Sequence, residues 1–99
     1  MAKTIALLGA LDTKGTEYAF VKQCIEAKGL RTLVIDVGVL GQPALEADVT
    51  RGEVARAAGE SVERLAEAGD RGRAVEAMAR GAGLLAEKLY GEGRFDGIM

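Results

Sequence analysis

The sequence predicts an α/β protein with an open parallel sheet, and the order of its apolar segments is the main observation behind this prediction. Positions 4–8 and 32–37 form short apolar runs, which are typical of strands buried on both faces of a sheet. A helix-like segment lies between them, so the three segments form a βαβ unit. Further helical segments and a third strand follow, giving the order β-α-β-α-α-α-β of a Rossmann-like sheet.

The first predicted strand, "TIALL" at positions 4–8, ends at Gly9. A helix is predicted from Thr16 to Lys28, because apolar residues recur there at three- and four-residue spacing. The predicted buried stripe of this helix consists of Phe20, Val21, Cys24 and Ile25. Cys24 is expected in the core, since a free cysteine behaves as a small hydrophobic residue.

The second predicted strand is "TLVIDV" at positions 32–37, which ends close to Asp36 and Gly38. A third strand begins within "FDGIM" and stops at Met99. Parallel sheets are normally buried on both faces and rarely leave a central edge open. We therefore expect residues 1–99 to be the N-terminal portion of a Rossmann-like domain, a fragment of a longer protein.

The segment between these two strands predicts three helices. Thr50 and Glu53 form a capping box, so the first helix begins there and should end near Gly59. Ser61 is an N-cap residue for a short second helix, which Gly69 ends.

Asp70 is the N-cap of a longer third helix, which reaches Tyr90. Its predicted buried stripe is Val75, Met78, Ala82, Leu85 and Leu89. Gly81 and Gly83 disfavour a helix interior, so we expect a close-packed neighbour at both positions.

The composition excludes several function classes. With no histidine and one cysteine, the chain cannot by itself form a histidine-dependent triad, a disulfide framework or an ordinary zinc site. A net charge of -2 argues against a nucleic-acid surface. No apolar run suits a membrane span or a signal peptide, so a cytoplasmic location is expected. No residues form a nucleophile–base pair, so we assign no catalysis.

Two segments, 9–15 and 36–41, follow the carboxyl ends of the first two strands, where open parallel sheets bind ligands. The candidate nucleotide-binding residues there are Gly9, Asp12, Thr13, Lys14, Gly15, Asp36 and Gly38. The amino end of a helix attracts anions, and Lys14 adds a positive charge for phosphate. Asp12 or Asp36 could bind Mg²⁺ or a ribose hydroxyl.

The segment "GALDTKGT", at positions 9–16, lacks the standard phosphate-binding fingerprints. Lys14 precedes Gly15, which reverses the Walker A order, and the dinucleotide fingerprint would need glycine at positions 11 and 14. Two interpretations stay open: an anion-binding loop, and a glycine-rich turn with a structural role only. Asp70 and Arg71 are likewise either a helix cap with a first-turn arginine or a further ligand contact.

Five segments, "LLGALDTKGTEYAFV", "LVIDVGVLGQP", "ADVTRGEVARAAG", "GDRGRAVEAMARGA" and "LYGEGRFDGIM", together resemble one family. The chain resembles the N-terminal part of the tomato mosaic virus resistance protein-like (Tm-one-like) ATP-binding domain family over nearly its whole length. This resemblance implies binding of ATP with Mg²⁺ by the loop from Asp12 to Gly15, together with the turn from Asp36 to Gly38. Asp70 and Arg71 match a family motif. The resemblance also implies a second glycine-rich loop beyond "FDGIM", which is absent from these 99 residues.

Three hypotheses about function follow. The first is a nucleotide-binding module that receives phosphates between the first strand and the first helix. The second is a fragment of a Rossmann-type enzyme that uses a dinucleotide or a phosphosugar. The third is an assembly module whose open sheet edge and apolar helix stripe pair with another subunit. The remainder of the parent chain and a homo-oligomer are further partners considered. The partner expected first is a nucleotide, and neither nucleic acid nor a membrane is expected.

Overall fold

The computed structural model describes residues 3–39 and 41–99, and its elements follow the predicted order. The strands and helices are β1 (Thr4–Gly9), α1 (Leu11–Ala27), β2 (Arg31–Asp36), α2 (Arg51–Ala57), α3 (Val62–Ala68), α4 (Arg71–Gly91) and β3 (Gly97–Ile98). The strands form one parallel sheet in the order β2-β1-β3, with Ile5 of β1 opposite both Thr32 and Gly97. The α/β class and the open Rossmann-like sheet are thus confirmed.

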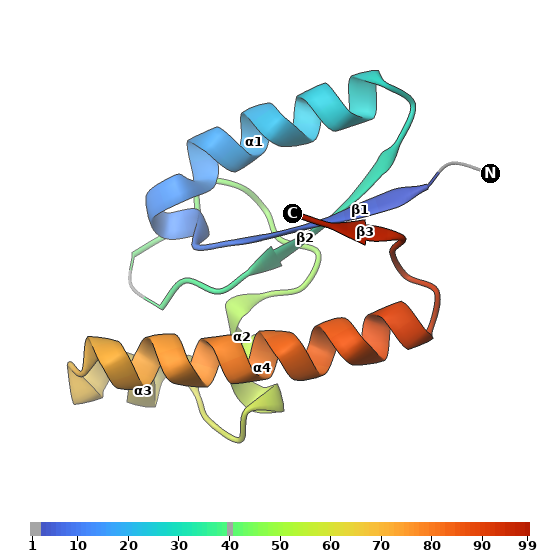
Figure 1. The fold of residues 1–99 in the computed structure, drawn as a ribbon. Coiled ribbons are helices and arrows are strands. Elements are labelled where there is room, and N and C mark those ends of the chain that lie inside the picture. Colours follow the sequence, from blue (N-terminus) through green and yellow to red (C-terminus); the bar gives the residue numbers. More distant parts are fainter. Residues whose placement is uncertain (1–2, 40) are drawn as a thin grey trace.

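The helices lie in two layers, one on each face of the sheet. Figure 1 shows α1 above the strands and α2, α3 and α4 below them. On the α1 face, Leu7, Leu11 and Val34 are buried, with Tyr18, Val21 and Ile25 partly buried against them. The opposite face has a larger core, which extends from Ala6 and Ile35 to Val54, Met78 and Phe95.

Helix α1 begins five residues earlier than predicted, at Leu11 instead of Thr16. Ala10 occupies the N-cap position without a side-chain cap, and the carboxylate of Asp36 caps the helix from the end of β2 instead. Gly15 therefore lies inside a helix. A Cβ atom at this position would come within 2.7 Å of the Cβ of Ala44, so glycine is needed for close packing.

The buried side of α1 also differs from the predicted stripe. Val21 and Ile25 pack against the sheet, but Phe20 is 67% exposed and Cys24 is exposed as well. Placing Cys24 in the core was wrong. The predicted stripe omitted Leu11 and Tyr18, which contribute to the inward side of the longer helix.

The predicted helix caps are confirmed. Thr50 and Glu53 form the complete capping box of α2, and the hydroxyl of Ser61 accepts a bond from the amide of Arg64 at the start of α3. Gly69 ends α3 in the left-handed conformation, with a φ of 63°. Asp70 caps α4 through the amide of Arg73.

Helix α4 buries most, but not all, of its predicted stripe. Met78, Ala82 and Leu89 are buried, whereas Val75 is 61% exposed and was wrongly placed in the core. Gly81 packs directly against the backbone of Val54 in α2, as a glycine in the helix interior suggested. No atom lies within 4 Å of a Cβ built at Gly83, so the close neighbour expected there is absent.

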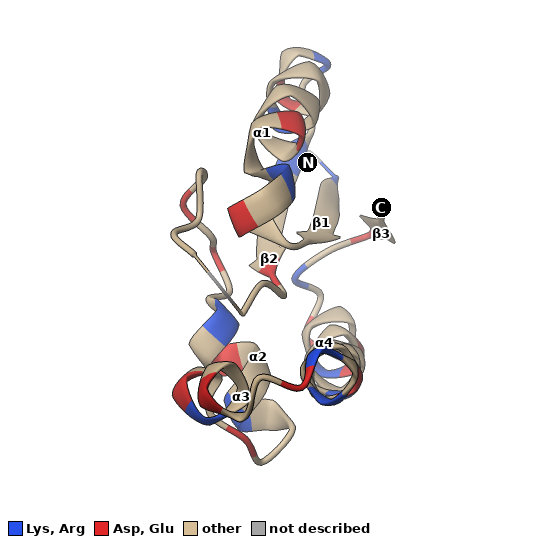
Figure 2. Cartoon of the chain, turned by 90° about the vertical axis from the view of Figure 1, so that its left-hand side faces the viewer, with Lys and Arg blue, Asp and Glu red and all other residues tan. Residues whose placement is uncertain are grey.

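Charged side chains are mixed over the helices. Figure 2 shows basic and acidic residues side by side on α3 and α4, in keeping with the net charge of -2. No helix in the described part of the chain is long and apolar enough to cross a membrane.

Candidate functional site

A cleft of about 410 Å³ opens at the carboxyl ends of β1 and β2. The first turn of α1 lines one side of it, and the residues directly after β2, Val37 to Val39, line another. The end of α3 and the beginning of α4 complete the wall. Ligand pockets are commonly of this size and occur at this edge of open α/β sheets.

The cleft brings together the two regions that the sequence indicated separately. Asp12, Thr13 and Gly38 line it from the sheet side, and Asp70 and Arg71 line it from the α3–α4 junction. Between these polar groups the wall is apolar, formed by Val37, Val39, Leu65, Ala74 and Val75. Such a lining, apolar with a few convergent polar groups, is typical of small-molecule sites.

The other candidate residues do not line the cleft. Lys14 is exposed in the first turn of α1, one residue beyond Thr13. Gly9 packs against the ring of Tyr18, whose hydroxyl donates to the carbonyl of Leu8 at 2.7 Å, and Gly15 lies against Ala44. The nucleotide contacts predicted for these three residues stay predictions.

Two backbone amides at the amino end of α1, the end expected to attract anions, already have a partner in the N-cap residue. The backbone N–H groups of Thr13 and Lys14 both donate to the carbonyl of Ala10, at 3.2 and 2.8 Å. The amino end of α1 is therefore a closed helical turn and not an open loop of free amides.

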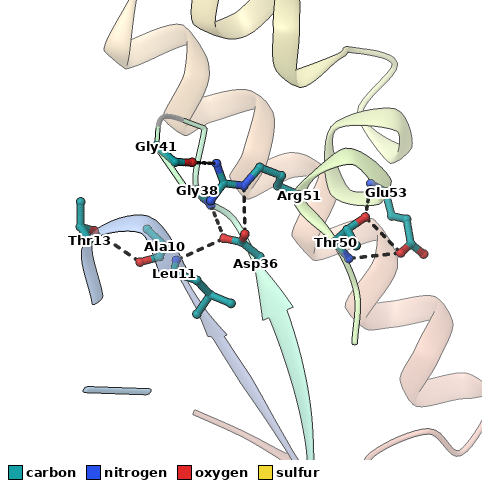
Figure 3. A network of polar contacts seen from close by, with 9 residues as sticks. All are labelled: Ala10, Leu11, Thr13, Asp36, Gly38, Gly41, Thr50, Arg51 and Glu53. Carbon is teal, nitrogen blue, oxygen red and sulfur yellow. Dashed lines mark hydrogen bonds and ion pairs between the residues drawn. The ribbon is translucent and has the colours of Figure 1, made fainter. Parts of the chain in front are cut away.

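Asp36 is buried at the end of β2 and connects several parts of the chain (Figure 3). Its Oδ1 accepts hydrogen bonds from the amides of Leu11 (3.2 Å) and Gly38 (2.9 Å). Its Oδ2 accepts from Nε of Arg51 at 2.9 Å. A negative charge at this position interacts favourably with the amino end of α1, where Oδ1 of Asp36 accepts from the amide of Leu11.

Arg51, the first residue of α2, holds the segment after β2 against the site. Besides Asp36, its guanidinium binds the carbonyl of Gly41 through Nη1 at 2.8 Å. Gly38 lies between charged groups: a Cβ there would come within 2.8 Å of Oδ1 of Asp12 and 3.0 Å of Nη2 of Arg51. Only a glycine fits this position without displacing one of the two side chains.

The sequence analysis did not identify Arg51. In "VTRGEV" it follows the N-cap Thr50, and this segment indicated only a helix start. Its partner Asp36 is fifteen residues away along the chain, and no spacing rule connects an acid at a strand end with the first residue of a later helix. The sequence offered one signal, the acid Asp36 within the apolar run of the second strand, because a carboxylate that becomes buried there requires a partner.

Asp70 and Arg71 occupy the amino end of α4. Oδ1 of Asp70 accepts from the amide of Arg73 at 3.0 Å, so the predicted capping role of Asp70 is confirmed. Arg71 is exposed at the mouth of the cleft. Among the described residues, no three Asp, Glu or Cys side chains form a group that could hold a metal ion.

Comparison with known proteins gives one consistent family. A family model described as "Uncharacterised protein family (UPF0261) N-terminal domain" matches residues 3–99. A UPF0261 protein of Clostridium tetani is 44% identical over 99 residues, covering 100% of this chain and 24% of that protein. A UPF0261 protein of Brucella suis is 37% identical over 95 residues, covering 96% of this chain and 23% of that protein.

The chain thus spans about a quarter of the length of the curated relatives it matches. No solved structure shows a significant match to it. These matches correct the family resemblance drawn from the sequence, since they identify UPF0261 and not the tomato mosaic virus resistance protein-like family.

Proposed function

The chain belongs to the UPF0261 family, of which it matches the N-terminal domain, and we propose that this domain binds a mononucleotide in the cleft beside β1 and β2. The observation that carries the proposal is the cleft itself. It lies where open parallel sheets bind ligands, and its wall combines an apolar surface with an exposed arginine and two carboxylates.

The nucleotide is oriented by the distribution of these groups. A purine base fits the apolar wall of Val37, Val39 and Leu65, which excludes water from its faces. The phosphates extend to the mouth of the cleft, toward the guanidinium of Arg71. An arginine offers several donors in a rigid planar arrangement that matches phosphate oxygens. Lys14, one residue beyond the lining, adds a second positive charge on the α1 side.

Mg²⁺ fits this arrangement as a companion of the phosphates. Mg²⁺ usually binds proteins through one or two carboxylates, with phosphates and water as its other ligands. Asp12 supplies one carboxylate from the cleft wall, while Asp70 is already bonded to the amide of Arg73. Asp12 is therefore the residue that would hold the ion, which would neutralise phosphate charge.

A mononucleotide agrees with the site better than a dinucleotide. In dinucleotide-binding Rossmann folds an acid at the end of the second strand binds ribose, and glycines near the first helix admit the pyrophosphate. Here Asp36 is 1% exposed and bonded to Leu11, Gly38 and Arg51. The amino end of α1 is likewise occupied by protein groups.

Isothermal titration of the chain with ATP and Mg²⁺ tests the proposal, with AMP and NAD as comparison ligands. We expect ATP to bind and Arg71→Ala to weaken its affinity by about tenfold or more, as expected for loss of a charged hydrogen bond. Arg73→Ala is the matched control, because Arg73 lies on the same turn but pairs with Glu60 outside the cleft. Absence of ATP binding at millimolar concentration, or equal losses in both variants, would contradict the proposal.

A further inference from the structure

Apolar side chains lie uncovered on the side of the molecule where β3 forms the sheet edge. Ile98 is 53% exposed, and it pairs with Ala6, which lies in the core on the α4 face. Since paired residues of parallel strands point to the same face, Ile98 also points to the α4 face. Figure 2 shows β3 and α4 on the same side of the molecule, away from β2 and α2.

Helix α4 presents an apolar flank to the same side. Its opposite flank packs on α2 at Gly81. At about 100° per residue, Val75, Ala79 and Tyr90 lie roughly 120 to 180° around the helix from Gly81. All three are exposed, Val75 by 61% and Tyr90 by 63%. The residues Val75, Ala79, Tyr90 and Ile98, with the open edge of β3, are called the β3-side surface below.

The sheet topology determines what can cover this surface. The connection from β1 to β2 places α1 on one face of the sheet. The connection from β2 to β3 runs across the sheet in the opposite direction and places α2, α3 and α4 on the other face. Parallel crossover connections are right-handed almost without exception. A further strand added beside β3 would continue in the direction from β2 to β3, so its crossover helix must lie on the α4 face. That helix would pack beside α4, against the apolar flank.

We propose that a fourth parallel strand beside β3, together with its crossover helix packed against α4, covers the β3-side surface in proteins as long as the relatives. About three quarters of the length of these relatives lies outside the region matched here, which is long enough to include such a strand and helix. The proposal does not require ligand binding in the cleft, although the β3-side surface shares Val75 with the cleft wall.

A second copy of the chain suits this surface less well. A twofold axis would pair the two β3 edges as antiparallel strands, and β3 has only two residues with which to form such a pair. The adjoining α4 flank carries Ala79, a small residue that allows the proposed crossover helix to approach α4 closely.

The test compares two proteins: the 99-residue chain, and a chimera in which this chain replaces the matching 24% of the Clostridium tetani protein. Ala79→Glu places a charge on the β3-side surface. It should lower the melting temperature of the chimera by several degrees and leave that of the chain unchanged, because the charge is buried only in the chimera. Leu84→Glu is the matched control, since Leu84 is 52% exposed on the other flank of α4.

Hydrogen exchange gives a second readout. The amides at positions 97–99 should exchange about 100-fold more slowly in the chimera, because an edge strand that gains a neighbour opens only by larger unfolding. Equal exchange in both proteins, or an Ala79→Glu effect no larger than that of Leu84→Glu, would overturn the proposal.

Sedimentation velocity of the 99-residue chain keeps the proposal testable if the chimera does not fold. A monomer is expected. A discrete dimer that Ile98→Glu dissociates and Leu84→Glu does not would assign the surface to a second copy and overturn the proposal.

Discussion

At the scale of single residues, Asp36 connects α1, β2, α2 and the segment that lines the cleft. Its carboxylate accepts bonds from Leu11, Gly38 and Arg51, and its side chain is 2% exposed against 15% for that of Arg51. Removing one partner of a buried ion pair leaves the other charge without compensation, and this is costly although the intact pair itself contributes little.

Asp36→Asn is therefore expected to destabilise the fold by about 3 kcal/mol, because the amide cannot compensate the charge of Arg51. Urea unfolding followed by circular dichroism measures the change. Glu17→Gln, a neutralised acid on the exposed side of α1, is the control and should change the stability by less than about 0.5 kcal/mol. Similar stabilities of the two variants would show that the Asp36–Arg51 pair does not hold these elements together.

Glu26 makes a contribution to stability that is lost as the pH falls. The ammonium of Lys22 and the hydroxyl of Thr32 donate to its Oε2 at 2.6 and 2.8 Å, and these bonds lower the pKa of Glu26 below its ordinary value of 4.5. A lowered folded-state pKa contributes stability above the unfolded value, and this stability is lost as the pH falls through the folded value.

Stability measured from pH 6 down to pH 3 should therefore decline less steeply in Glu26→Gln than in the parent chain. Thr32→Val removes only one of the two donors and should give an intermediate slope. An unchanged slope in Glu26→Gln would show that this carboxylate is not coupled to folding.

Single residues also show where prediction from the sequence reached its limit. Asp12, Thr13, Gly38, Asp70 and Arg71 were named from local patterns, and the structure brings them to one cleft. Their meeting follows from the rule that ligand sites lie at the carboxyl ends of parallel strands. Arg51 was missed, because local patterns contain no information on its pairing with Asp36, fifteen residues away along the chain.

At the scale of elements, the start of α1 shows why helix boundaries are difficult to predict. Helix starts are recognised by a local Ser, Thr, Asp or Asn, but Ala10 provides no cap and Asp36 does so from another strand. Gly15 resembled a loop residue. The structure requires glycine there because of close packing against Ala44, a tertiary contact that the local sequence does not show. Helices α2, α3 and α4 have local caps, and their starts were predicted correctly.

The packing of α2 against α4 gives a matched pair of glycine substitutions within one helix. Gly81→Ala should destabilise the fold by about 1 to 3 kcal/mol, because its Cβ would collide with the backbone of Val54, which cannot easily move. Gly83→Ala has open space and should stabilise the helix by up to about 1 kcal/mol. Urea unfolding of both variants checks the prediction, and effects of the same sign would contradict it.

At the scale of the whole molecule, the two faces of the sheet are unequally supported. The α1 face buries Leu7, Leu11 and Val34. The core on the other face joins β1 and β2 to α2, α3 and α4. Regions with fewer buried apolar contacts open at lower free energy than the rest of the fold. Helix α1 should therefore detach before the sheet and α4 unfold.

Native-state hydrogen exchange tests this order and connects it with the cleft. Amides of α1 from Tyr18 to Ala27 should exchange faster than those of β1 and α4, through an opening that leaves the larger core intact. Because the first turn of α1 lines the cleft, the proposed binding of a nucleotide there would hold this helix closed. At ten times the Kd of ATP with Mg²⁺, exchange of these amides should slow by about tenfold. If ATP binds while α1 exchange stays unchanged, the ligand does not contact α1, and the site must lie elsewhere on the molecule.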